Sequence, residues 1–127
     1  MSIENIILLT CILLLIQIFI PILIEQVFLK NINLSYQLSS RDKSIEKSIY
    51  FNRGKRALNN LLETLPIFIL LIFLSLYKEV ENSNLALLWL VFRLLYMPIY
   101  MLGMKYIRTI LWFGAITCLI MMGIKFI

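Results

Sequence analysis

The chain contains no histidine and only two cysteines, Cys11 and Cys118. The absence of histidine excludes imidazole general-base catalysis and removes the commonest protein metal ligand. The two cysteines each lie inside an apolar run, so they provide neither a disulfide framework nor a cysteine metal cluster. We therefore expect no metal site.

Charged residues are also scarce, at 15% of the 127 residues, whereas 61% are hydrophobic. Ordinary soluble domains have about 25% charged and about 45–50% apolar residues. This excess excludes a soluble globule, and it excludes a disordered chain because disorder requires low hydrophobicity. The mean hydropathy of +0.92 indicates a lipid environment. A chain of this length has room for about four membrane spans and no soluble domain.

The apolar runs predict one transmembrane domain, residues 1–127, with spans at about 6–29, 57–77, 85–102 and 106–127. Pro21 interrupts the first run, and we expect a kink there. The very short connection around Gly103 forces the last two helices to be antiparallel neighbours. The predicted fold is therefore an all-α, integral membrane four-helix bundle with up-down-up-down topology. The polar stretch 31–52 either forms a loop or begins the second helix at the surface.

The formal net charge of +5 is unevenly distributed. Seven of the twelve basic residues lie between positions 30 and 56, namely Lys30, Arg41, Lys43, Lys47, Arg53, Lys55 and Arg56. Their position beside a membrane segment is typical of a cytoplasmic loop facing anionic headgroups, and it does not indicate nucleic-acid binding. By the positive-inside rule, the loop at about 31–52 is cytoplasmic and both termini of this multi-pass protein lie on the other side.

The polar residues inside the spans converge in depth. With a rise of 1.5 Å per residue, the expected depths below the cytoplasmic surface are about 13 Å for Arg93, about 9 Å for Glu63 and Tyr96, and about 3–4 Å for Asn60, Tyr100 and Arg108. Residues three, four and seven apart share a helix face, so Arg56, Asn60 and Glu63 form one stripe and Arg93, Tyr96 and Tyr100 another. These stripes predict a cationic, aromatic-lined pocket that opens toward the cytoplasm.

An unpaired arginine at membrane depth costs about 2.5–3.5 kcal/mol even on a lenient scale. Glu63 is the only acid at a suitable depth, so we expect it to pair with Arg93. Structural readings stay open beside the functional ones: the Arg93 and Glu63 pair could serve packing alone. Tyr100 could belong to an interfacial aromatic belt, and Arg108 could extend to the headgroups. Glu25 is a lesser candidate, for ion pairing or for proton coupling.

The same residues form a pattern that resembles the MAPEG family, the membrane-associated proteins of eicosanoid and glutathione metabolism, in a small prokaryotic-type form. Residues 56–66 are similar to the family's Arg-Ala, Asn, Glu, Pro series at the start of the second helix. Arg93, Tyr96 and Tyr100 resemble an Arg-x-x-Tyr-x-x-x-Tyr run of leukotriene-synthase-like members. Arg108 stands at the start of the fourth helix, where family enzymes place the arginine thought to activate the glutathione thiol.

The resemblance implies a homotrimer with glutathione, as co-substrate, bound between adjacent subunits near the cytoplasmic side. Carried over by position, six residues would hold the tripeptide: Arg56, Asn60, Glu63, Arg93, Tyr96 and Tyr100. Arg108 would face its sulfur as the catalytic residue. Phe28, Leu29 and Lys30 stand where eicosanoid-forming relatives carry arginines, Leu61 replaces an aspartate, and Trp112 replaces a tyrosine. These departures favour glutathione binding over eicosanoid conversion.

The resulting hypothesis is an integral-membrane glutathione transferase or peroxidase that acts on hydrophobic small molecules reaching it from the lipid. Arginines suit a ligand with two carboxylates, and a nearby guanidinium favours the nucleophilic thiolate. Two alternatives remain. One is a small proton-coupled multidrug-type transporter that uses Glu25 or Glu63, and the other is a catalytically silent binding protein of the same fold.

Overall fold

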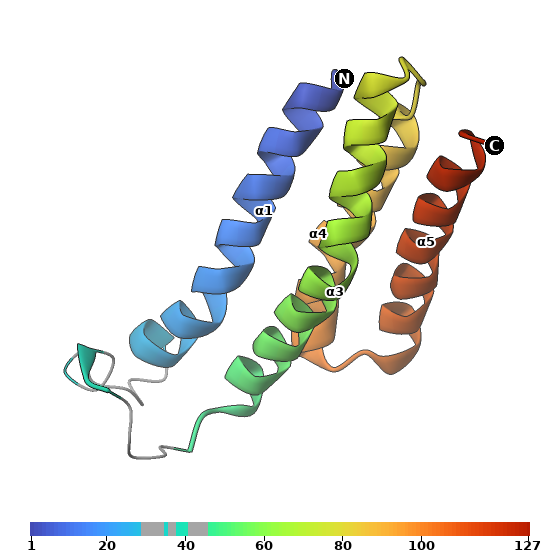
Figure 1. Cartoon of the computed structure of the whole chain (residues 1–127). Helices are drawn as coiled ribbons and strands as arrows, with labels where there is room; N and C mark the ends of the chain where they lie inside the picture. Colours follow the sequence, from blue (N-terminus) through green and yellow to red (C-terminus); the bar gives the residue numbers. More distant parts are fainter. Residues whose placement is uncertain (29–34, 36–37, 41–45) are drawn as a thin grey trace.

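A computed structural model describes residues 1–28, 35, 38–40 and 46–127. In this part of the chain the elements are α1 (Ile3–Leu23), the π-helical turn η1 (Ile24–Phe28), α3 (Ile49–Tyr77), α4 (Ser83–Leu102) and α5 (Lys105–Ile124). Figure 1 shows the four long helices side by side, with the N- and C-termini at the same end of the bundle. All four are long and apolar enough to cross a membrane. The predicted all-α four-helix membrane bundle is confirmed.

The second long helix resolves one of the open alternatives, because α3 begins at Ile49, inside the polar stretch. Ser48 caps this helix, and its hydroxyl accepts a hydrogen bond from the Phe51 backbone N–H at 3.1 Å. Two turns of polar sequence therefore precede the apolar part of α3. Most of the predicted loop at 31–52, including Arg41 and Lys43, lies outside the described residues, as does Lys30.

Helices α1 and α3 touch closely at Pro21 and Gly54. Pro21 is buried in the last turn of α1, and its ring leaves no room for a side chain at position 54. A Cβ placed on Gly54 would lie 2.7 Å from the Pro21 Cγ, which is closer than real Cβ contacts. Glycine at position 54 is therefore what allows the two helices to meet at this end of the bundle.

Just after Pro21, η1 carries the fully buried Glu25 to the start of α3. One carboxylate oxygen of Glu25 accepts a hydrogen bond from the backbone N–H of Ser48, with N and O 2.5 Å apart. A negative charge at a helix N-terminus interacts favourably with the helix dipole and with its unpaired N–H groups. The structure thus gives Glu25 a partner in the backbone at the start of α3.

The interior of the bundle is apolar and aromatic, and Trp89 stacks on Phe68 with ring centroids 3.9 Å apart. At the end that carries the termini, the buried Asn82 amide donates to the Ser75 hydroxyl at 2.8 Å and to the Met122 carbonyl at 3.5 Å. This side chain therefore ties α3, α4 and α5 together. On the adjacent surface, hydrogen bonds from Ser83 to Glu81 hold the pKa of that carboxyl below its ordinary value.

The turn between α4 and α5 depends on Gly103, which adopts a left-handed conformation with φ of 81° and ends α4. Only glycine takes this conformation without steric cost. Arg53 of α3 lies against this glycine and donates to the Met101 carbonyl at 3.1 Å, one of the carbonyls that a helix C-terminus leaves unpaired. The end of α4 is thereby held beside α3.

The contact between Gly54 and Pro21 predicts an unequal response to two glycine-to-alanine substitutions. Gly54→Ala overpacks a rigid contact and should lower the free energy of unfolding by about 1–3 kcal/mol. Gly123→Ala is the control, because its Cβ would meet no atom closer than 3.9 Å and alanine favours a helix. Denaturant unfolding in detergent, followed by tryptophan fluorescence, measures both. Equal stabilities of the two variants would contradict the close contact.

Candidate functional site

The polar interior is organised by Arg93, whose side chain is only 1% exposed. Its guanidinium donates from Nη1 to the Asn60 carbonyl oxygen Oδ1 at 2.6 Å and from Nη2 to the Thr64 hydroxyl at 2.8 Å. The backbone carbonyl of Arg93 accepts a bond from the buried Gln17 amide at 3.3 Å. One residue of α4 is therefore hydrogen-bonded to both α1 and α3.

These partners correct the predicted pair of Arg93 with Glu63. Glu63 is exposed, and the two neutral groups, Asn60 and Thr64, occupy the positions around the guanidinium. The reason is rotation rather than depth. At about 100° per residue, Asn60 and Thr64 lie about 40° apart on α3, whereas Glu63 lies about 60° to the other side of Asn60. The carboxylate thus lies to one side of the guanidinium and acts on it only through longer-range electrostatic attraction.

Four of the predicted site residues line a pocket of about 240 Å³ between α3, α4 and α5. Its six lining residues are Asn60, Tyr96, Tyr100, Arg108, Thr109 and Trp112. None of the six is acidic, and all of them carry a polar group with an N–H or O–H. A pocket with this lining is suited to an anionic ligand.

Arg108 lies inside the pocket against an aromatic ring. Its guanidinium carbon is 4.5 Å from the centroid of the Tyr100 ring, a cation–π distance. The Tyr96 and Tyr100 rings are 5.5 Å apart and tilted at 59°. Because α5 begins at Lys105, the arginine is in the first turn and close to α4. The structure therefore turns Arg108 toward the pocket, whereas the alternative reading had it extend to headgroups.

The remaining predicted residues lie around the pocket and do not line it. Arg56 and Glu63 are exposed on α3, on the stripe that the sequence pattern indicated. Arg93 is buried behind Tyr96, with its guanidinium carbon 5.6 Å from the Tyr96 ring centroid. In a single copy of the chain, Arg56 and Glu63 thus face outward, whereas Arg93 lies behind the pocket-lining Tyr96.

The sequence reasoning did not single out Thr64, Thr109 or Arg53. Thr64 follows Asn60 by four residues, so its position on the same face of α3 was a usable signal. Thr109 lies beside Arg108, and its hydroxyl donates to the Lys105 carbonyl at 3.0 Å. No local pattern indicates that Arg53 reaches the end of α4, because that contact depends on the packing of two helices distant in sequence.

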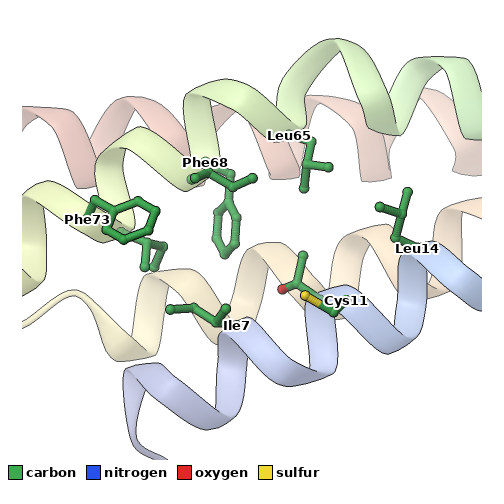
Figure 2. Close-up of a pocket in the computed structure, with 9 residues that line it drawn as sticks. Ile7, Cys11, Leu14, Leu65, Phe68 and Phe73 are labelled. Carbon is green, nitrogen blue, oxygen red and sulfur yellow. The ribbon is translucent and has the colours of Figure 1, made fainter.

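A second pocket, of about 200 Å³, lies between α1 and α3 in the apolar part of the bundle. Figure 2 shows Ile7, Cys11 and Leu14 on α1 facing Leu65, Phe68 and Phe73 on α3. Its lining is otherwise apolar, apart from Thr10, whose hydroxyl is bonded to the Ile6 carbonyl at 2.8 Å. With no charged lining residue, this pocket does not suit an anionic ligand.

The fold and the pocket define the class of protein: a small integral-membrane four-helix bundle with an arginine- and tyrosine-lined site between its helices. The family model described as the MAPEG family matches residues 6–127, nearly the whole chain. The chain belongs to the MAPEG family, and it is thus a membrane protein of the glutathione and eicosanoid metabolism kind. No curated protein and no solved structure matches the chain in the corresponding comparisons.

The hydrogen bonds of Arg93 predict which substitutions on α3 destabilise the protein. Thr64→Val removes an acceptor from a buried guanidinium, so the free energy of unfolding should fall by about 1–3 kcal/mol. Glu63→Gln changes a side chain that is exposed within a single subunit, so it should alter the free energy of unfolding of the subunit by less than about 0.5 kcal/mol. Chemical unfolding of the two variants in the same detergent compares them. A larger loss for Glu63→Gln would restore the carboxylate as the partner of Arg93.

Proposed function

We propose that the protein is a glutathione-binding membrane enzyme of the transferase or peroxidase type. The observation that carries this proposal is Arg108 inside an acid-free pocket, against Tyr100 and across from Asn60. Glutathione is a net anion with two carboxylates, and N–H and O–H groups can hold it in such a pocket. Membership of the MAPEG family supports the same ligand.

In the proposed mechanism, Arg108 stabilises the thiolate of glutathione. Thiols are mostly protonated at neutral pH, and a neighbouring guanidinium in a site of low dielectric favours the anionic, nucleophilic form. In the transferase reaction the sulfur forms a bond to an electrophilic carbon, and the leaving group departs with the electron pair of its former bond. The tyrosines and Asn60 hold the tripeptide, while the apolar substrate arrives from the surrounding lipid.

We further propose that the working form is a homotrimer, with the ligand between adjacent subunits. The exposed stripe of Arg56 and Glu63 supports this arrangement, because both charges lie beside the pocket without lining it. A neighbouring subunit would cover them and complete the site. The proposed orientation keeps the pocket on the cytoplasmic side, next to most of the basic residues.

Arg108→Ala tests the mechanism. We expect it to abolish the thiolate absorbance of bound glutathione and to lower kcat with a chlorodinitrobenzene, because it removes an interaction that matters most in the transition state. Lys105→Ala, which removes an exposed cation one turn earlier, is the matched control and should leave both signals in place. Turnover and thiolate absorbance that survive in Arg108→Ala would refute the mechanism.

Binding and transport measurements on the unaltered protein separate the alternatives. Glutathione binding without turnover in the unaltered protein would indicate the silent binding protein. A protein that binds no glutathione but moves a cationic dye against a proton gradient in vesicles would indicate the transporter. In the transporter reading Glu25 is one of the two candidate acids: its Oε1 accepts a hydrogen bond from the Ser48 backbone N–H, and its buried Oε2 has no hydrogen-bond partner in the described part of the chain.

The trimer is tested by native mass spectrometry from detergent. We expect a trimer for the unaltered chain and a shift toward monomer for Glu63→Arg, which places a repelling charge on the exposed stripe. Lys78→Glu, at the other end of α3, is the control and should remain trimeric. A predominantly dimeric protein would contradict the proposed assembly.

A further inference from the structure

The side chain of Arg93 is placed where a ligand cannot reach it. It is 1% exposed and is absent from the lining of the pocket between α3, α4 and α5, although Asn60 and Tyr96 of that lining lie against it. A residue that holds a carboxylate needs donors that open into the pocket. Both terminal nitrogens of Arg93, Nη1 and Nη2, are instead directed to Asn60 and Thr64.

The guanidinium determines how the Asn60 amide is turned. Arginine has five N–H donors and no acceptor, so only the carbonyl oxygen of an asparagine can face it at 2.6 Å. The amide nitrogen of Asn60 is on the other branch of the same planar group and therefore points away from Arg93. Asn60 is half-buried and lines the pocket, so its amide nitrogen has the pocket within its reach on that side.

Thr64 completes the arrangement by holding the guanidinium in position. Its hydroxyl oxygen accepts from Arg93 Nη2 at 2.8 Å, while the same hydroxyl is 3.1 Å from the Leu61 carbonyl of its own helix. The threonine is thereby fixed to the backbone of α3 and fixes Arg93 in turn. Asn60 and Thr64 are one turn apart, so the guanidinium bridges two successive turns of α3.

We propose that Arg93 is a positioning residue, which turns the amide nitrogen of Asn60 toward the pocket and does not itself contact the ligand. Its positive charge also strengthens the hydrogen bond to the Asn60 oxygen and polarises the amide, which makes the N–H groups better donors to an anion. The identity of that anion as glutathione rests on the proposed function. The orientation of the amide does not.

The orientation is tested by NMR on detergent-solubilised protein with ¹⁵N-labelled asparagine. The side-chain amide signal of Asn60 is identified by its loss in Asn60→Ala. We expect its protons to exchange with water through the pocket, and we expect the signal to move in Arg93→Met and to keep its position in Thr64→Ser. An amide protected from water, or a signal unchanged in Arg93→Met, would overturn the proposal.

The functional consequence is tested by a double-mutant cycle on glutathione affinity, measured by titration. Asn60→Ala should weaken binding about tenfold, the loss expected for one hydrogen bond, and Arg93→Met should weaken it by a similar factor. If Arg93 acts through Asn60, the double variant also loses about tenfold, because the two residues are not independent. A loss of about a hundredfold would mean that both contact the ligand, and the proposal would be wrong.

Two further variants keep the test decisive. Arg93→Lys retains the positive charge and an N–H donor group and should restore most of the affinity lost in Arg93→Met. Lys55→Met, which changes an exposed residue of α3, is the control for a general loss of cations. If Arg93→Met does not fold, Thr64→Val takes its place in both experiments. A protein that binds no glutathione overturns the proposed function, while the NMR result still decides how Asn60 is turned.

Discussion

A buried arginine in a membrane bundle needs hydrogen-bond partners, and the partners of the two terminal nitrogens of Arg93 govern the arrangement of the helices around it, although its Nε has no partner in the described part of the chain. Its guanidinium bonds to two side chains of α3, and its backbone carbonyl accepts a bond from α1. Each bond depends on the register between neighbouring helices, since a shift of one residue would turn Asn60 and Thr64 away by about 100°. The polar contacts therefore specify how apolar helices pack, which dispersion and lipid exclusion do only weakly.

Contacts at the two ends of the bundle maintain that register. At one end, Asn82 connects three helices through hydrogen bonds. At the other, the contact of Pro21 with Gly54 lets α1 approach α3, and Arg53 fastens the turn at Gly103 to α3. The contact of Arg53 with the turn at Gly103 matters for the pocket, because Arg108 follows Gly103 by five residues. The direction of Arg108 therefore depends on Gly103 and Arg53, neither of which lines the pocket.

Much of the fold could be predicted from the sequence because membrane helices are long, apolar and few. The depth of polar residues was also predictable, since rise per residue is nearly constant in a helix, and depth together with shared helix faces grouped Asn60, Tyr96, Tyr100 and Arg108. Their roles in holding a ligand stay predictions. The start of α3 at Ile49 was not predictable, because a polar sequence at a membrane surface is compatible with both a loop and a helix.

The partner of Arg93 could not be predicted because depth does not determine which way a side chain turns. Charge favoured Glu63, whereas packing selected Asn60 and Thr64. For a buried ion pair, both the carboxylate and the guanidinium must lose their hydration water. That desolvation often cancels the attraction between the two charges. An amide and a hydroxyl satisfy the same N–H groups at a lower desolvation cost. They also leave the carboxylate of Glu63 exposed next to the pocket, where a neighbouring subunit of the proposed trimer can meet it. The neutral partners of Arg93 thus keep the charge of α3 at the surface where the proposed site would be completed.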